Sequence, residues 1–149
     1  MARSISLIAP VLALSLAVSA CATTGVQGPK DTSSVSLPGV RYEVLKSGAA
    51  NGAHPRRADE IVVRYEGRLT NGQLFDSSAS EASGTATFPL GKLIPGWVAV
   101  LQLMRPGDEW RIYLPAYMAY GEKGAGPIPP NSDLIFKVEL VSIKSPPSN

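Results

Sequence analysis

The sequence predicts an α+β domain in which an antiparallel sheet curls over one short helix. From about residue 40 onward, apolar residues mostly alternate with polar ones, which is the two-residue period of strands with one buried face. Only the segment that begins at Gly96 places apolar residues at spacings of three and four, as a helix does. A single short helix needs a surface to cover, and the sheet supplies that surface.

The first half of the domain contains four predicted strand segments. VRYEVLK (40–46) is a short candidate, and EIVVRYEGRL (60–69) alternates clearly between apolar and polar residues. The TNG at 70–72 is a hairpin turn signal that leads into QLFDSS (73–78). TATFPL (85–90) is a further short candidate. These segments predict a sheet built largely from neighbouring strands.

The helix and two more strands complete the domain. WVAVLQLM (97–104) places Trp97, Val100, Leu101 and Met104 on one face, and the following Arg-Pro-Gly ends the helix because proline cannot continue it. Alternation then returns at 110–114 and again in DLIFKVEL (133–140). No internal repeat is present, so residues 40–149 are predicted to form one domain.

Length and composition agree with one soluble globular domain and an N-terminal appendage. The chain has 149 residues, of which 44% are hydrophobic and 17% charged, and its net charge is +2. A charge so nearly balanced does not indicate a nucleic-acid partner.

Residues 1–20 have the layout of a secretory signal peptide. Arg3 precedes an apolar run that is shorter than the ~20 residues needed to span a bilayer, and small residues precede Cys21. The VSAC sequence resembles the lipobox of bacterial lipoproteins, which implies cleavage before Cys21 and lipidation of its thiol. Ala22, where an aspartate would favour the inner membrane, then implies the outer membrane, facing the periplasm. The alternative is an ordinary signal peptide, with Cys21 as a spare thiol.

Residues 21–39 are predicted to be a flexible tether. The segment is small, polar and interrupted by Gly and Pro, with almost nothing to bury. Such a tether would let the domain at 40–149 stand off the membrane surface. Cys21 is the only cysteine, so the chain can form no internal disulfide.

Several kinds of chemical site are disfavoured. His54 is the only histidine, lies in a turn-like loop and is expected to be exposed, which makes a transition-metal site improbable. No GXSXG motif is present, and GEKGAGP lacks the ending of a phosphate-binding loop. Arg56 and Arg57 are expected to be a solvated charge pair. We therefore expect neither a metal nor a cofactor.

Aromatic and apolar residues beside the loops are the remaining site candidates. Each taken singly is more often a core residue than a site residue, but in a sheet-and-helix arrangement several could converge on a cleft. The candidates are Tyr65, Phe75, Asp76, Leu93, Ile94, Trp97, Tyr120, Ile128 and Phe136. The pattern alone indicates a binding cleft and no particular reaction.

Four segments carry a specific family resemblance. In order and at similar spacing, VRYEGRLTNGQLFDSS, PLGKLIPGW, LPAYMAYGEKGAG and PIPPNSDLIFKVELVSIK resemble the signature segments of the FKBP-type peptidyl-prolyl isomerases. The resemblance covers about Val40 to Lys144 and is greatest to bacterial periplasmic, Mip-like members. It implies a sheet of five or six strands around one helix, and catalysis of X-Pro bond rotation in periplasmic or outer-membrane folding clients.

The resemblance also implies a role for each candidate. Trp97 matches the floor under the prolyl ring, and the aromatic walls match Tyr65, Phe75 and Phe136. Leu93 and Ile94 match the aliphatic rim, and Ile128 matches an aliphatic residue of a loop. The residues matched to catalysis are Tyr65, Asp76 and Tyr120. The Ile94 N–H and the Tyr120 hydroxyl would orient substrate carbonyls, while Asp76 would act electrostatically or fix the Tyr65 hydroxyl.

The resemblance leaves other expectations and alternatives. The expected ligands are proline-containing polypeptides and the macrolide inhibitors tacrolimus and rapamycin. ASEASGTATF (79–88) is small and polar where many members carry a basic residue and an extra aromatic. No segment matches the long N-terminal dimerisation helix of Mip-like proteins, so a monomer is expected. The alternatives are a non-catalytic module or chaperone that binds proline-containing segments in the same cleft, and a structural lipoprotein.

Overall fold

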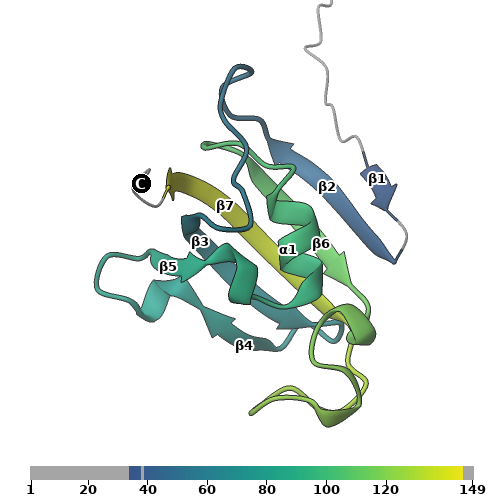
Figure 1. The fold of residues 1–149 in the computed structure, drawn as a ribbon. Helices are drawn as coiled ribbons and strands as arrows, with labels where there is room; N and C mark the ends of the chain where they lie inside the picture. The colour runs from purple at the N-terminus through teal and green to yellow at the C-terminus, as the bar shows by residue number, and fades with distance from the viewer. Residues whose placement is uncertain (1–33, 38, 146–149) are drawn as a thin grey trace, which may run out of the picture. The chain divides into compact units, whose positions relative to one another are not determined.

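One antiparallel sheet and one helix form the part of the chain that the computed structural model describes, residues 34–37 and 39–145 (Figure 1). The strands are β1 (Ser34–Leu37), β2 (Val40–Lys46), β3 (Glu60–Leu69), β4 (Leu74–Ser77), β5 (Ala86–Pro89), β6 (Glu109–Leu114) and β7 (Leu134–Lys144). Their order across the sheet is β1-β2-β6-β7-β3-β4, and β5 pairs with β3 as a seventh strand. Helix α1 (Pro95–Leu101) covers one face. The predicted antiparallel sheet over one short helix is confirmed.

Strand β1 lies in residues that the sequence analysis assigned to the tether. It pairs antiparallel with β2, with Leu37 opposite Val40, and Gly39 turns the chain with a φ of 82°. The pairing uses backbone groups, which any residue except proline carries, so the polar composition did not reveal it. Residues 1–33, which include the predicted signal peptide and Cys21, lie outside the described residues.

No helix among the described residues is long and apolar enough to cross a membrane.

The pairing of β3 is interrupted where the functional site lies. One edge of β3 pairs with β7 along its whole length, from Glu60 opposite Lys144 to Leu69 opposite Leu134. The other edge pairs with β5 up to Val63 and with β4 from Glu66 onward. Tyr65 therefore lies on β3 in the gap between two partner strands.

The turn between β3 and β4 confirms the hairpin predicted from TNG. The Leu69 N–H donates to the Gln73 carbonyl at 2.9 Å, and the Gly72 N–H donates to the Leu69 carbonyl at 2.9 Å. Gly72 has a φ of 88°, a conformation that glycine adopts readily.

Helix α1 is shorter than the sequence predicts. It starts with Pro95, whose fixed φ suits a first helical turn, and it ends at Leu101 instead of near Met104. The next residues form tighter turns, in which the Leu103 N–H donates to Val100 and the Met104 N–H donates to Leu101. Met104 is nevertheless fully buried, which explains why its spacing extended the helical pattern.

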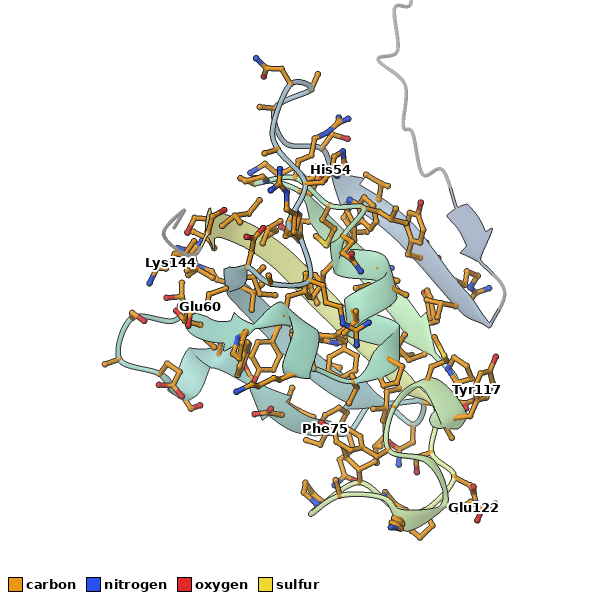
Figure 2. All side chains as sticks on the ribbon, in the orientation of Figure 1. His54, Glu60, Phe75, Tyr117, Glu122 and Lys144 are labelled. Carbon is orange, nitrogen blue, oxygen red and sulfur yellow. The ribbon has the colours of Figure 1, made fainter. Side chains whose placement is uncertain are left out.

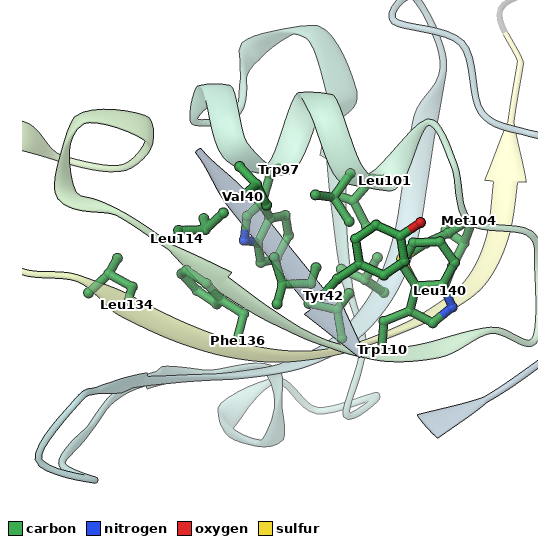
Figure 3. Packing of buried hydrophobic residues seen from close by; sticks show 14 of the residues in the cluster. Val40, Tyr42, Trp97, Leu101, Met104, Trp110, Leu114, Leu134, Phe136 and Leu140 are labelled. Atoms are coloured by element: carbon green, nitrogen blue, oxygen red, sulfur yellow. The ribbon is translucent and has the colours of Figure 1, made fainter. Parts of the chain in front are cut away.

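The hydrophobic core lies between α1 and the sheet (Figure 3). Its fully buried side chains come from the helix, from the turns beside it and from the inner face of the sheet, and the largest are Ile61, Leu90, Leu101, Met104, Ile112, Leu114, Leu134 and Leu140. At one end, Tyr42 and Trp110 stack with ring centroids 4.3 Å apart. At the other end, Trp97 packs against Phe136.

The outer face of the sheet carries the charged residues of the alternating pattern. Ion pairs link Arg64 with Glu139 at 3.1 Å, Lys137 with Glu109 at 2.8 Å and Arg111 with Glu43 at 3.1 Å. Exposed pairs of this kind contribute about 0–1 kcal/mol each. They keep this face hydrated and leave the opposite face for the core.

Candidate functional site

A small aromatic cleft lies where the start of α1 meets β3, β4, β5, β7 and the loop after β6. Its volume is about 180 Å³, and its lining is Tyr65, Phe75, Asp76, Phe88, Leu93, Ile94, Trp97, Tyr120 and Phe136. Figure 2 labels Phe75 in this region, and also Tyr117 and Glu122 on the loop that carries Tyr120. Eight of the nine residues predicted from the sequence therefore converge on one cavity.

Trp97 forms the base of this cleft. Its side chain is only 4% exposed, and three aromatic rings stand nearly perpendicular to the indole. The centroid distances from Trp97 are 5.2 Å to Phe136, 5.4 Å to Tyr65 and 6.3 Å to Phe88, with interplanar angles of 80–85°. Such edge-to-face contacts are a favourable arrangement of aromatic rings. Together the four rings make a rigid apolar box, which we call the aromatic box.

Gly67 allows two walls of the cleft to meet. The rings of Phe75 and Phe136 pack edge to face, 5.6 Å apart, directly over Gly67. A Cβ atom at this position would lie 2.6 Å from Phe75 Cζ and 2.8 Å from Phe136 Cε1. Any larger residue would therefore displace both walls.

Tyr65 and Asp76 form a hydrogen-bonded pair at the edge of the cleft. The Tyr65 hydroxyl donates to Asp76 Oδ2 at 2.7 Å, and the Ser77 N–H donates to Asp76 Oδ1 at 2.9 Å. Burial, followed by the hydrogen bond and charge of Asp76, raises the pKa of Tyr65 above its ordinary value. The phenol is therefore neutral at physiological pH, and its proton points at the carboxylate.

Ser78 holds the backbone of Tyr65 where β3 lacks a strand partner. The Tyr65 N–H donates to Ser78 Oγ at 3.0 Å, and the same hydroxyl donates to the Gly84 carbonyl at 3.1 Å. Ser78 is only 3% exposed. The serine thus replaces a missing ladder hydrogen bond and ties β3 to the loop between β4 and β5.

Tyr120 adds a second phenol hydroxyl to the lining of the cleft. It lies in the loop between β6 and β7, and its side chain is 38% exposed. Burial and then the charge of Asp76 raise its pKa, so this phenol is also neutral at physiological pH. Within the described residues its hydroxyl makes no hydrogen bond, and neither does the Ile94 N–H at the rim. Both donors are available to a ligand.

Ile128 does not line the cleft, unlike the prediction. It is 6% exposed and belongs to the core cluster. Reciprocal backbone hydrogen bonds with Ala125, of 3.0 and 2.8 Å, close a tight turn in this loop. Motif matching placed Ile128 in the correct loop, but it could not show which way that turn directs the side chain.

Phe88 is the cleft residue that the sequence analysis did not identify. It lies on β5, in the TATFPL segment, and its ring is within 6.0 Å of Tyr65 as well as near Trp97. The alternation in this segment was a usable signal, because Thr87 and Pro89 are exposed and Phe88 is half-buried. Phe88 therefore supplies an aromatic wall of the cleft from β5.

The remaining polar candidates lie outside the cleft. His54 is exposed, as expected, with Nδ1 3.2 Å from the Met104 carbonyl oxygen and Nε2 3.2 Å from Arg105 Nε. Arg56 and Arg57 are also exposed. Among the described residues, no group of three potential metal ligands is present.

Comparisons with known proteins identify a matching family. Residues 51–141 match the family model of the FKBP-type peptidyl-prolyl cis-trans isomerases. The chain is 51% identical over 107 residues to peptidyl-prolyl cis-trans isomerase Mip of Coxiella burnetii, a match that covers 71% of this chain and 45% of the relative. It is 44% identical over 112 residues to outer membrane protein MIP of Legionella longbeachae, which covers 74% of this chain and 47% of the relative.

Solved structures show the same fold. The crystal structure of FkpA from Escherichia coli has a TM-score of 0.72 and 35% identity, over 79% of this chain and 55% of that one. A peptidyl-prolyl cis-trans isomerase from Pseudomonas syringae has a TM-score of 0.65 and 36% identity, over 71% and 76%. The chain spans less than half the length of the Mip relatives that it matches. This chain belongs to the FKBP-type peptidyl-prolyl cis-trans isomerases, with bacterial Mip and FkpA proteins among its relatives.

Proposed function

We propose that this protein is a peptidyl-prolyl cis-trans isomerase that accelerates rotation about X-Pro bonds in folding polypeptides. The observation that carries the proposal is the aromatic box, in which three rings surround the indole of Trp97. A cavity of about 180 Å³ is of a size to hold a small apolar ring. A prolyl ring is such a group, and the carbonyls beside it need donors at the rim.

The reaction needs no nucleophile. X-Pro rotation is slow, tens to hundreds of seconds, because the amide must lose its partial double-bond character. The planar amide is more charge-separated than the twisted one, so an apolar cavity disfavours the planar state more. A site that stabilises the transition state relative to the ground state accelerates the reaction. The aromatic box supplies that environment without covalent chemistry.

The rim donors would position the substrate. The Ile94 N–H and the Tyr120 hydroxyl lie at the cleft with no partner among the described residues, so each is able to bind a substrate carbonyl. Asp76 already accepts hydrogen bonds from Tyr65 and Ser77. We assign Asp76 the role of fixing the Tyr65 ring, and its charge additionally acts on the twisted amide.

The experiment that tests the proposal is NMR exchange on a short X-Pro peptide with catalytic amounts of the protein. Exchange between the cis and trans signals should accelerate with protein concentration. Peptide binding without acceleration would instead identify a non-catalytic binding module or chaperone. A protein that neither binds nor accelerates would contradict both, leaving a structural lipoprotein.

We further propose that the protein acts at the outer membrane, facing the periplasm, where Cys21 carries lipid. The support is the lipobox-like VSAC sequence, together with a relative named as an outer membrane protein. Cys21→Ala should move the protein from the membrane fraction to the soluble fraction. Unchanged fractionation would refute the anchor.

Two further properties follow from the same proposal. The aromatic box would bind macrolides such as tacrolimus and rapamycin as competitors of the prolyl ring, which inhibition of exchange would detect. The protein would act as a monomer. Light scattering, which measures the molar mass in solution, would detect a dimer.

A further inference from the structure

The cleft carries an acidic group that has no basic partner. Asp76 is exposed and is the only charged residue in the cleft lining, which contains no Lys or Arg. Its two oxygens accept hydrogen bonds from Tyr65 and Ser77, and neither donor is charged. The cleft therefore presents a negative charge that nothing in its lining neutralises.

Other carboxylates on the sheet differ in this respect. Glu43, Glu66, Glu109 and Glu139 each lie within 3.3 Å of an Arg or Lys nitrogen. The four ion pairs formed by the described residues do not include Asp76. These four carboxylates are thus paired with a basic side chain, whereas the carboxylate at the cleft is not.

A second carboxylate adds to the negative charge around the cleft. Glu81 is exposed in the loop between β4 and β5, and its charge contributes to raising the pKa of Tyr65. No Lys or Arg of the described residues lines the cleft beside Tyr65 and Tyr120. Lys92 is exposed before Leu93, but it does not line the cavity. The phenols are neutral at physiological pH, so the local charge at the cleft is acidic.

We propose that this cleft selects clients with Lys or Arg beside the proline and disfavours clients with Asp or Glu there. The inference rests on the proposed isomerase function. Consecutive Cα atoms are 3.8 Å apart, so with proline in the aromatic box the side chains of its neighbours lie over the rim. Asp76 is at that rim, and the Glu81 N–H donates to the carbonyl of Ser78, whose hydroxyl accepts the Tyr65 N–H.

The expected preference is moderate because the acidic groups are exposed. In water, a unit charge about 8 Å away changes an equilibrium by about two- to threefold. Replacing an acidic client residue by a basic one reverses the sign, so the Lys to Glu ratio should be about three- to tenfold. The effect should vanish at ~1 M salt, where the Debye length is about 3 Å.

The test is a series of peptides that differ only in the residue before proline, with Lys, Gln or Glu at that position. NMR exchange gives kcat/KM for each peptide without a coupling protease that has preferences of its own. At ~10 mM salt, the order should be Lys, then Gln, then Glu, and at ~1 M salt the three should converge. Equal values at low salt, or a ratio that persists at high salt, would overturn the proposal.

Charge variants outside the cleft lining test whether Glu81 contributes to the preference for Lys over Glu. Glu81→Gln should lower the Lys to Glu ratio by about twofold, and Glu81→Lys should lower it further. Glu60→Gln is the matched control, because Glu60 is exposed at the start of β3 and makes none of the described ion pairs. An equal effect of the Glu60 and Glu81 variants would contradict a local cause.

The same peptides separate this inference from the proposed function. If no peptide exchanges faster with the protein, the isomerase proposal fails. The charge preference is then decided by the Kd of each peptide, measured by titration at both salt concentrations. Tighter binding of the Lys peptide at low salt supports the inference, and equal Kd values overturn it.

Discussion

Gly67→Ala tests whether the geometry of the aromatic box determines activity. Gly67 does not line the cleft, but its Cα lies under the contact between Phe75 and Phe136. An added Cβ at 2.6 Å from Phe75 Cζ must separate from it by about 0.8 Å to reach the 3.4 Å at which ordinary contact begins. The strand cannot retreat easily, because β3 pairs with β7 and β4 on its two edges. The two rings must therefore move.

The magnitude follows from this displacement. Overpacking of this kind costs about 1–3 kcal/mol of folding free energy. A misplacement of about 1 Å at a site can lower its activity by about a hundredfold. We expect kcat/KM for an X-Pro peptide to fall about ten- to a hundredfold, measured by NMR exchange at a temperature where the variant is fully folded.

Gly48→Ala is the control for the loss of stability. A Cβ at Gly48 would lie 2.2 Å from the Pro106 carbonyl oxygen, a comparable clash in a loop away from the cleft. This variant should also be destabilised, as thermal unfolding would show, while the folded protein keeps its kcat/KM. Wild-type activity in Gly67→Ala, or an equal loss in both variants, would refute the link between the box and activity.

Three further predictions use other features of the site. Because the pKa of Tyr65 is raised, its protonated form stabilises the fold fully below about pH 10, and this contribution is lost as the pH rises above that value. Tyr65→Phe should therefore lose unfolding free energy less steeply above pH 10 in denaturant titrations, and a slope equal to that of the wild type would contradict the cause. Ser78→Ala leaves the Tyr65 N–H without its partner and should lower the free energy of unfolding by about 1–3 kcal/mol and also lower kcat/KM. The control is Asp108→Asn, at a buried polar residue that does not line the cleft. This control should lower the free energy of unfolding without lowering kcat/KM. In a Trp110→Phe background, a prolyl peptide should change the fluorescence of Trp97, and an unchanged spectrum at saturating peptide would exclude Trp97 as the base of the cleft.

Much of the fold could be predicted because its signals are local. Alternation identified the strands, TNG identified the hairpin, and apolar spacings of three and four identified the helix. The end of the helix was predicted too far along the chain, because Met104 is buried although it lies in a turn after the helix. Strand β1 was assigned to the tether, because its four residues, Ser-Val-Ser-Leu, are too short an alternation to stand out in a polar segment.

The site was predictable where a residue's role follows from its motif. Seven of the eight residues that converge on the cleft lie on strands, on the first turn of α1 or just before it, and Tyr120 lies in the loop between β6 and β7. Ile128 lies in a loop whose closure with Ala125 depends on backbone conformation, so its direction could not be read from the sequence. The hydrogen bond from the Tyr65 N–H to Ser78 could not be predicted for a similar reason, since it depends on the gap between the two strands that pair with β3.

The most direct test of the central claim compares the two buried tryptophans in one exchange measurement. Trp97 forms the base of the aromatic box, whereas Trp110 stacks on Tyr42 at the other end of the core. With both variants confirmed as folded, Trp97→Leu should abolish the acceleration of X-Pro exchange, and Trp110→Leu should retain it. Wild-type acceleration by Trp97→Leu, or equal loss in the two variants, would contradict catalysis by the aromatic box.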